Sequence, residues 1–434
     1  MGIVDTMMVG RVSAAAVGAV SIGGTLFYTI ALLGVGIVLG LDTLISQSYG
    51  AGDLEDCHRS LINALYLILP LVPILMAAVL AWVPLLGWFG INPEVLRETI
   101  PYLKALAWSI PPLLLYFVLR RYLQGMNLVH PVMFALVSAN LVNAVCDWAF
   151  IYGHLGARAM GAEGAGWATC LARVYMALVL VGYVIWFEMR HRIGLFAASL
   201  RFDAARVRRL LALGVPAALQ IVLEVGVFAA ATTLAGRLEP AALAAHQIAM
   251  NVVSTTFVVA LGLGAAAAVR VGQALGRGDA EAASHAGWAA IALGAAFMTS
   301  TACAMLAVPA LIVRAYTNEP DVIRIGATLL AVGAAFQIFD GLQGVATGAL
   351  RGAGDTRTPM FCHLVGYWAI GLPLGYYLCF HLGWGITGLW IGLCVALILI
   401  GSVLVPAWRR TIAGEIARLA PKPNALANSK LADA

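Results

Sequence analysis

Residues 45–55 read ISQSYGAGDLE and residues 271–281 read VGQALGRGDAE, so Gln47, Gly50, Gly52, Asp53 and Glu55 recur 226 positions later. The match continues back without a gap to Gly10-Arg11, whose counterpart is Gly236-Arg237. Between these ends the identical pairs include Ala15 and Ala241, Ala16 and Ala242, Ala19 and Ala245, Ile22 and Ile248, and Gly36 and Gly262. A register shared over about 45 residues indicates an internal duplication.

The composition is that of an all-α polytopic membrane protein. Hydrophobic residues make up 62% of the 434 positions and charged residues 11%, and the mean hydropathy is +0.91. Soluble domains carry about 25% charged residues. The net charge of +5 does not indicate nucleic-acid binding, because the basic residues lie in short loops between apolar runs. Seven cysteines without CxxC spacing predict neither a disulfide framework nor a structural metal site.

Eleven apolar runs are long enough to cross about 30 Å of hydrocarbon. They lie at 14–47, 60–88, 98–120, 129–152, 164–187, 210–236, 241–270, 283–313, 322–350, 359–382 and 386–408. The duplication requires a partner before Gly10 for the run at 210–236, so Met1 to Val9 is predicted to be the end of a truncated first helix. Since a full span needs about 20 residues, we expect the native chain to start about 20–35 residues upstream.

Six spans in each half predict two parallel six-helix bundles, related by an axis along the membrane normal, as in many transporters. Residues 188–209 join the halves and contain six arginines, which places this linker in the cytoplasm by the positive-inside rule. The predicted parts are an N-terminal lobe at 1–189, a linker at 190–209, a C-terminal lobe at 210–410 and a disordered cytoplasmic tail at 411–434.

Four acidic residues lie inside or at the edge of apolar runs: Asp5, Asp147, Glu224 and Asp340. An intramembrane charge is estimated to cost about 2.5–3.5 kcal/mol, so each is a functional candidate. The alternative for any one of them is a protonated or hydrogen-bonded acid that only ties helices together.

In the first half, Asn140, Asn143 and Asp147 are spaced to share one helix face. The topology places Asp5 at a similar depth, and Thr169 on the next span could add a hydroxyl. Such an oxygen-rich cluster suits a hard cation or a shared proton. For Asn140, a role in joining helices is the favoured interpretation.

In the second half, Glu224 and Asp340 lie near the middle of their spans, and neither has an acidic counterpart in the other half. Phe336 precedes Asp340 by one helical turn. An aromatic face there could help to hold a cation, and ordinary packing is the alternative. Asp42 has no obvious partner in sequence and is a weaker candidate.

Four motifs carry a resemblance to a known family: residues 4–10 (VDTMMVG), 242–251 (ALAAHQIAMN), 269–279 (VRVGQALGRGD) and 350–359 (LRGAGDTRTP). In this order they resemble multidrug and toxic compound extrusion (MATE) transporters of the bacterial NorM branch. The resemblance covers essentially the whole chain.

The resemblance implies a V-shaped exporter of twelve helices, the first one incomplete here, that exchanges cationic drugs and toxins for Na+ or H+. It places the coupling-ion site on Asp5, Asn143, Asp147 and Thr169 in the first lobe, and on Glu224, Asp340 and Phe336 in the second. The aromatic at Phe336 is often tyrosine in the family. Gln247 matches a polar position that faces the central cavity. A monomer in the bacterial inner membrane is implied, with a cytoplasmic C-terminus and no cofactor besides the coupling ion.

A lipid-linked precursor flippase is the alternative with a similar architecture. Such flippases typically line their cavity with basic residues, whereas the intramembrane charges recognised above are acidic. A membrane enzyme is disfavoured, because the sequence has no HExxH or GxSxG and its eight histidines are scattered. An ATP-driven pump within this chain is disfavoured by the absence of GxxxxGK[ST].

Overall fold

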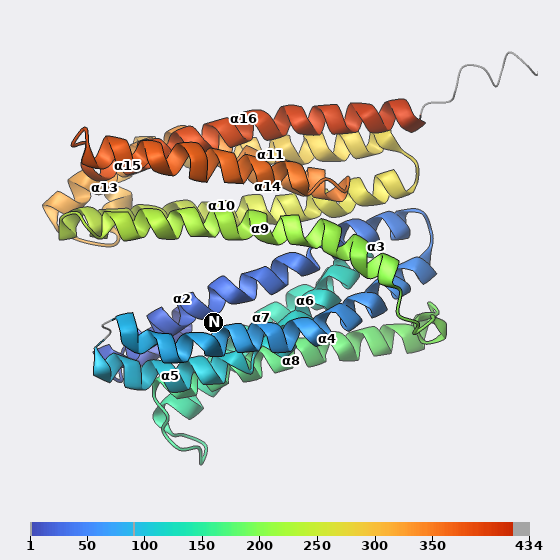
Figure 1. Cartoon of the computed structure of the whole chain (residues 1–434), viewed down its shortest axis with the longest axis horizontal. Helices are drawn as coiled ribbons and strands as arrows, with labels where there is room; N and C mark the ends of the chain where they lie inside the picture. The colour runs from blue at the N-terminus through green and yellow to red at the C-terminus, as the bar shows by residue number, and fades with distance from the viewer. Residues whose placement is uncertain (1, 90–91, 420–434) are drawn as a thin grey trace, which may run out of the picture. The chain divides into compact units, whose positions relative to one another are not determined.

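The computed structural model describes residues 2–89 and 92–419, and within these ranges it consists of helices joined by short connections, with no strand (Figure 1). The predicted all-helical class is confirmed. The helices group into two compact units that divide inside α9, between Val222 and Leu223, and Gly50–Gly52 group with the second unit.

Unit 1 contains eight α-helices, two short 3-10 turns and the first part of a ninth helix. Their bounds are α1 Gly2–Val9, α2 Ala14–Val38, α3 Gly40–Gly50, α4 Leu54–Leu85, η1 Leu86–Phe89, α5 Pro93–Ala107, α6 Ile110–Gly125, α7 His130–Tyr152, α8 Ala162–His191, η2 Leu195–Ala197 and α9 Ala204–Ala235.

Unit 2 contains the rest of α9 and seven further α-helices, with one π-helical stretch among them. Their bounds are α10 Pro240–Gly276, α11 Ala280–Ala307, α12 Pro309–Arg314, α13 Pro320–Gly352, α14 Arg357–His363, η3 Leu364–Gly371, α15 Leu372–Phe380 and α16 Gly385–Leu419. The three elements from Arg357 to Phe380 follow one another without a break and match the predicted span at 359–382.

The duplication is visible in the backbone. The pair α2 and α3 begins and ends 226 positions before α10 does. Asp53 and Asp279 then cap the next helices in the same way, each accepting a 2.8 Å hydrogen bond at Oδ1 from the amide three residues later. Gly52 and Gly278 precede them with φ of +78° and +76°, a left-handed conformation that favours glycine. The copied motif therefore encodes a helix-ending turn and the cap that follows it.

Within the described ranges, nine helices are long and apolar enough to cross a membrane, and the bent pair α5–α6 makes a tenth candidate. The sequence predicted a span at 98–120, and the structure forms it from two helices that meet at 43°. The break lies at Trp108-Ser109, and α6 starts at Ile110, just before Pro111-Pro112. Proline has no backbone N–H, so Pro111 and Pro112 cannot form the hydrogen bonds to the carbonyls of Ala107 and Trp108 that a continuous helix would need.

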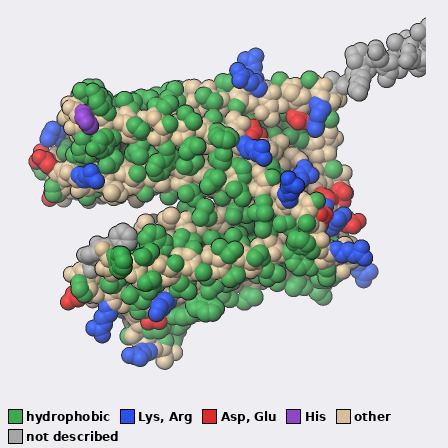
Figure 2. Space-filling view, viewed as in Figure 1, with side chains coloured by type: hydrophobic (Ala, Val, Ile, Leu, Met, Phe, Trp, Pro, Cys, Tyr) green, Lys and Arg blue, Asp and Glu red, His purple; other side chains and the backbone are tan. Residues whose placement is uncertain are grey.

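The surface and the helix contacts both fit a membrane bundle. In the face shown in Figure 2, apolar side chains cover the middle of each unit and most charged side chains lie toward the helix ends. Large apolar residues such as Leu69, Leu141 and Leu178 are more than 60% exposed. Within unit 2, α10 and α13 meet through small residues, and a Cβ on Gly348 would lie 2.0 Å from the Gly264 carbonyl oxygen. This spacing lets the two backbones approach closely.

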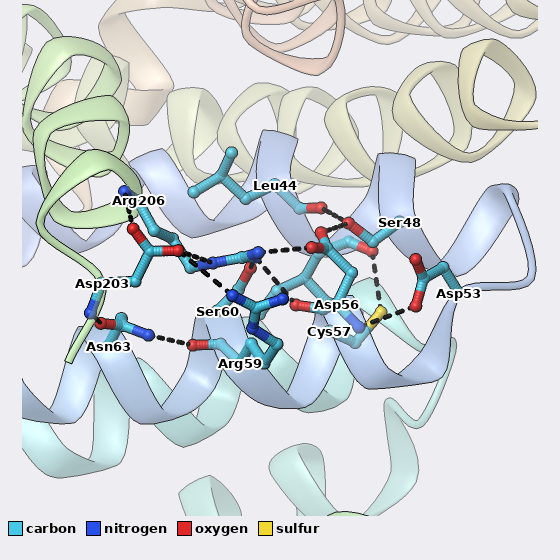
Figure 3. A network of polar contacts seen from close by, with 11 residues as sticks. Leu44, Ser48, Asp53, Asp56, Cys57, Arg59, Ser60, Asn63, Asp203 and Arg206 are labelled. Carbon is cyan, nitrogen blue, oxygen red and sulfur yellow. Dashed lines mark hydrogen bonds and ion pairs between the residues drawn. The ribbon is translucent and has the colours of Figure 1, made fainter. Parts of the chain in front are cut away.

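Helices reach into both ends of the predicted linker at 190–209, since α8 continues to His191 and α9 begins at Ala204. A polar network in unit 1 fastens the start of α9 to the start of α4 (Figure 3). Arg206 is its centre, with Nη2 2.5 Å from Asp56 Oδ1 and Nη1 2.8 Å from Ser60 Oγ. Its Nε lies 3.7 Å from Asp203 Oδ2, and the Asp203 amide donates to Asn63 Oδ1 at 2.8 Å.

The last helix is longer than predicted. The sequence placed a disordered tail at 411–434, but α16 continues to Leu419, and an ion pair of 2.7 Å joins Arg418 to Glu415 one turn earlier. Residues 420–434 of the predicted tail lie outside the described residues.

Candidate functional site

Unit 2 brings together the two acids that the sequence predicted there. Glu224 comes from α9 and Asp340 from α13, and the Gln343 side chain lies between them. Gln343 Nε2 donates to Glu224 Oε1 at 3.0 Å and to Asp340 Oδ1 at 3.4 Å. Asp340 is 4% exposed and Gln343 is fully buried. One amide thus holds two carboxyl groups that come from different helices.

His363 adds a fourth side chain to this group, from the last position of α14. Its Nε2 lies 3.6 Å from Glu224 Oε2, and its Nδ1 lies 2.7 Å from the Pro359 carbonyl oxygen. The imidazole is fully buried. We call Glu224, Asp340, Gln343 and His363 the unit 2 cluster.

A local change in helix geometry follows His363. The π-helical stretch η3 begins at the next residue, and π-helical turns occur frequently at functional sites. Within it, the Tyr367 ring packs edge-on against His363 at 5.4 Å between centroids. The buried Tyr367 hydroxyl has no hydrogen-bond partner in the described part of the chain, and it interacts electrostatically with Glu224 and Asp340.

Phe336 and Gln247 lie outside these contacts. Phe336 is buried on α13, and its ring packs on Trp390 at 5.9 Å. Gln247 is exposed on α10, directly after the buried His246. A cation-holding role for Phe336 and a cavity-facing role for Gln247 stay predictions.

Unit 1 gathers the predicted residues of the first half. Asp5 on α1 accepts a 2.9 Å hydrogen bond at Oδ2 from Thr169 Oγ1 on α8. Asp147 and Asn143 on α7 are fully buried, and Asp147 interacts electrostatically with Asp5. Among residues 2–89 and 92–419, no N–H or O–H group donates to Asp5 Oδ1, to either Asp147 carboxyl oxygen or to the Asn143 amide oxygen, and Asn143 Nδ2 has no acceptor. The Asp5 and Asp147 carboxyl groups lie close enough to share a hydrogen bond when one of them is protonated. We call these four residues the unit 1 cluster.

The buried polar atoms of the unit 1 cluster are suited to bind a proton or a small cation. A buried polar group without a partner costs about 1–3 kcal/mol, so native proteins keep few of them. Carboxyl and amide oxygens in an apolar bundle are suited to accept a proton or a small cation. Asn140 Nδ2 donates to the Leu136 carbonyl of its own helix at 2.8 Å.

The sequence reasoning missed a buried arginine beside the unit 1 cluster. Arg173 follows Thr169 by one turn of α8 and is 3% exposed. Its Nη1 donates to Ser109 Oγ, and its guanidinium lies over the Phe27 ring at 4.7 Å from the centroid. Tyr102 interacts electrostatically with Arg173 as well as with Asp5 and Asp147. The expectation that intramembrane charges are acidic was therefore wrong for this unit.

Asp42 also has a basic partner that the sequence did not reveal. Arg121 Nη1 lies 3.4 Å from Asp42 Oδ2, and both side chains are almost fully buried. This ion pair joins α3 to α6 across 79 positions, so a structural role accounts for Asp42.

Sequence signals for the missed residues existed but were weak. Gln343 follows Asp340 by three positions and Arg173 follows Thr169 by four, so each lies on the helix face of a predicted residue. His363 follows the motif at 350–359 by one turn. Its contact with Glu224 joins residues 139 positions apart, which no spacing rule predicts.

Comparison with known proteins gives consistent results. A model of the MatE family matches residues 1–149 and 216–377 of the chain. "Probable multidrug resistance protein NorM" of Brucella suis is 34% identical over 418 residues, which cover 94% of this chain and 88% of the relative. "Multidrug resistance protein PmpM" of Pseudomonas aeruginosa is 38% identical over 412 residues, covering 92% and 84%.

A solved structure described as MATE in the bent conformation has a similar fold. Its TM-score is 0.86, and the match covers 97% of this chain and 92% of that one. At 19% sequence identity, this similarity concerns the fold alone.

Proposed function

The chain belongs to the MatE family, and from this premise we propose that it is a secondary active efflux transporter, which exports cationic and amphipathic compounds in exchange for Na+ or H+. Its curated relatives are described as multidrug resistance proteins, which supports drug-like compounds as its substrates. The observation that carries the proposal is the unit 2 cluster, where Gln343 joins Glu224 and Asp340 inside an apolar bundle.

The chemistry of this cluster suits exchange. Two carboxyl groups in a medium of low dielectric attract a cation strongly. A cationic substrate and a coupling ion would compete for the same oxygen atoms, so that binding of one weakens binding of the other. The coupling ion drives the transporter between its two access states only through a difference in its affinity for them.

The unit 1 cluster would contribute a second cation or proton site under this proposal. Asp5, Asn143, Asp147 and Thr169 supply its oxygen atoms, and Arg173 adds a nearby fixed positive charge. Because Asp5 aligns with Ala231 in the repeat, the copied scaffold would carry two different sites. The transporter would act as a monomer in the bacterial inner membrane, with its linker and C-terminus in the cytoplasm.

Transport in reconstituted vesicles tests the proposal. The full chain would be placed in proteoliposomes, and ethidium movement followed by fluorescence while a Na+ gradient and a pH gradient are imposed separately. We expect one of the two gradients to drive ethidium against its own gradient. Absence of transport under both gradients would contradict antiport.

A lipid-linked precursor flippase is the second candidate, and one observation favours it: Arg173 is a buried basic residue inside an apolar span. An anionic lipid headgroup would need such a charge. However, Arg173 is already engaged by Ser109 and by the face of Phe27. Movement of a fluorescent polyprenyl phosphate across the same vesicles, with no ethidium transport, would support the flippase.

A further inference from the structure

The surface of unit 1 has a groove between the start of α7 and the end of α8, two helices that pack on each other (Figure 1). Its volume is about 500 Å³, within the range of about 300–1,000 Å³ that is common for small-molecule sites. The walls are mainly apolar and aromatic. They consist of His130, Pro131 and Phe134 on α7 and of Val179, Gly182, Tyr183 and Trp186 on α8.

The groove exists because α7 and α8 pack closely at one end and leave space at the other. Near the loop that joins them, a Cβ on Gly164 would lie 2.7 Å from the Phe150 carbonyl oxygen. Further along, the Tyr175 hydroxyl donates to Ser138 Oγ at 3.1 Å. About two turns later on α8, a Cβ on Gly182 would meet no neighbouring atom within 4 Å. The absence of a side chain at Gly182 therefore keeps this end open.

The groove is separate from the unit 1 cluster. Phe134 precedes Asp147 by 13 positions on α7, which at about 3.6 residues per turn places the two side chains roughly 140° apart around the helix. Asp147 interacts with Asp5 on α1, so Phe134 points to a different side of α7. It is 61% exposed. A molecule in the groove would thus lie against the outside of unit 1, away from the proposed ion-binding residues.

The linker end of the groove is basic. His130 forms part of its wall, and Arg190, His191 and Arg192 follow at the end of α8, all four of them exposed. The acid of this segment, Glu188, is 6% exposed, and its Oε1 accepts a 3.2 Å hydrogen bond from a backbone amide of the linker. The positive charges at the rim are therefore not offset by an exposed acid of the same segment.

The start of α7 adds to this positive field. Its N-cap residue is Val129, which has no side-chain group to accept a hydrogen bond from the amides of the first turn. The amide groups at the start of a helix and the helix dipole both favour an anion at that end. An anionic group at the rim would meet this helix end together with the basic side chains.

The aromatic side chains indicate how the groove lies in a membrane. Trp186 is 54% exposed, and its ring contacts those of Tyr183 and His191 at 5.5 and 6.3 Å between centroids. Tryptophan and tyrosine are enriched at the level of lipid headgroups. Val179, about two turns before Trp186, then lies deeper in the hydrocarbon. From its rim inward, the groove is therefore basic, then aromatic, then apolar.

We propose that this groove binds one anionic phospholipid, with its phosphate at the basic rim and one acyl chain along Phe134, Gly182 and Val179. The groups of such a lipid follow the same order from headgroup to chain. Basic pockets between membrane helices bind anionic headgroups through the same electrostatic attraction. Under the topology proposed above, the lipid comes from the cytoplasmic leaflet. The inference goes beyond the transport function and does not depend on it.

The charge at the rim favours this occupant over others. A cationic drug would approach Arg190 and Arg192, which repel it. A zwitterionic lipid such as phosphatidylcholine has an ammonium group beside its phosphate, so the same arginines attract it less. Phosphatidylglycerol has the negative phosphate alone. The groove should therefore bind phosphatidylglycerol in preference to phosphatidylcholine.

Native mass spectrometry of the purified full chain tests the proposal, because it counts bound lipids one by one. The chain would be stripped of lipid in detergent and titrated with phosphatidylglycerol or with phosphatidylcholine of the same acyl chains. We expect the first phosphatidylglycerol to bind at least about tenfold more tightly, because the two arginines attract its net charge. Equal affinities for the two lipids would overturn the proposal.

Filling the groove locates the site. Gly182→Leu adds a side chain where no neighbour is displaced, and we expect it to weaken phosphatidylglycerol binding at least about tenfold. Gly262→Leu is the matched control: Gly262 on α10 is also exposed, with no neighbouring atom within 4 Å of an added Cβ, and should leave binding as in wild type. Wild-type affinity in a folded Gly182→Leu would overturn the proposal.

Removing the charge of the rim tests the headgroup contact. The double variant Arg190→Gln, Arg192→Gln should lose the preference for phosphatidylglycerol and keep its affinity for phosphatidylcholine. The matched control is Arg409→Gln, Arg410→Gln, which neutralises an exposed pair on α16 and should keep the preference. If both double variants kept it, the basic rim would not bind the headgroup and the proposal would fail.

If Gly182→Leu does not fold, Trp186→Ala gives the second test of the location. It removes one wall of the groove, so we expect phosphatidylglycerol binding to weaken at least about tenfold. Trp288→Ala is its control, because Trp288 is an exposed tryptophan on α11 in unit 2. Equal binding by the two alanine variants would contradict the assignment.

The same variants reveal a different occupant. If Gly182→Leu lost ethidium binding and kept phosphatidylglycerol binding, the groove would belong to the substrate and the lipid proposal would be wrong. If lipid-free wild type were a dimer and Gly182→Leu a monomer, a second copy of the chain would occupy the groove, which would also overturn it. The transport experiments above do not affect these outcomes, because bound lipid is measured by mass.

Discussion

Oδ2 of Asp5 accepts a 2.9 Å hydrogen bond from Oγ1 of Thr169, which ties α1 to α8 across 164 positions of sequence. No N–H or O–H group in the described ranges donates to Asp147 or to the Asn143 amide oxygen, and the Asp147 carboxyl lies close enough to that of Asp5 for the two to share a proton. The Thr169 hydroxyl therefore holds in place a group whose remaining polar atoms are open to a proton or a cation.

Replacing Thr169 by valine should destabilise unit 1. The change keeps the side-chain shape but removes the donor, and a hydrogen bond to a charged group contributes about 1.5–3 kcal/mol. We expect the free energy of unfolding in detergent to fall by about that amount, and Thr169→Ser to restore most of it. As a control, Thr299→Val removes an exposed hydroxyl that bonds to the Ala295 carbonyl of its own helix. An equal loss in both valine variants would show that the Asp5 contact contributes nothing.

Neutralising either acid of the unit 2 cluster should abolish efflux. Asp340→Asn and Glu224→Gln keep the side-chain size but remove the negative charge that attracts a cation. We expect ethidium efflux from cells to fall at least about tenfold in each, with unchanged protein levels in the membrane. Asp321→Asn is the control, because Asp321 is exposed and pairs with Arg324 on the surface. Normal efflux in both cluster variants would refute their role in transport.

The parts of the fold that could be predicted from sequence depend on local patterns. The repeat predicted two related halves, and Asp53 and Asp279 indeed cap equivalent helices after equivalent glycine turns. Apolar length predicted the spans, because each helix must satisfy its own backbone in a membrane. The bend between α5 and α6 lies beside Pro111-Pro112, where the missing backbone N–H groups interrupt the helix.

The acids of the two clusters could be predicted from the sequence, but their neighbouring side chains could not. The cost of burying a charge identified Asp5, Asp147, Glu224 and Asp340, because an isolated acid in an apolar run can be recognised from the sequence alone. Their neighbours were not visible in this way. His363 and Arg173 lie beside the clusters because of how the helices pack. The sequence shows that each is in or near an apolar run, but it does not show which distant residue its side chain contacts. The assignment of Asp42 changed for the same reason, once Arg121 was found beside it.

Close helix packing in unit 2 predicts an asymmetric effect of adding one methyl group. A Cβ on Gly348 would lie 2.0 Å from the Gly264 carbonyl oxygen, whereas a Cβ on Gly262 meets no atom within 4 Å. We expect Gly348→Ala to force α10 and α13 apart and to lower the free energy of unfolding by about 1–3 kcal/mol. Gly262→Ala should be neutral or slightly stabilising. Equal melting temperatures in the two variants would contradict this packing.

The network around Arg206 predicts an energetic coupling between the linker and α4. The Arg206 side chain is 14% exposed and that of Asp56 34%, so solvent screens their 2.5 Å contact only in part. Lysine at 206 would keep the charge but not the fork that reaches Asp56 and Ser60 together.

A double-mutant cycle with Arg206→Lys and Asp56→Asn should therefore give a coupling of about 1 kcal/mol in the free energy of unfolding. The coupling should weaken in high salt, since added ions screen partly exposed charges. Arg324 and Asp321 provide the matched control: both are at least 75% exposed, so their cycle should give less than about 0.5 kcal/mol. If the two cycles gave the same value, the linker would be held by its backbone and apolar contacts, and the Arg206 network would have no part in fastening α9 to α4.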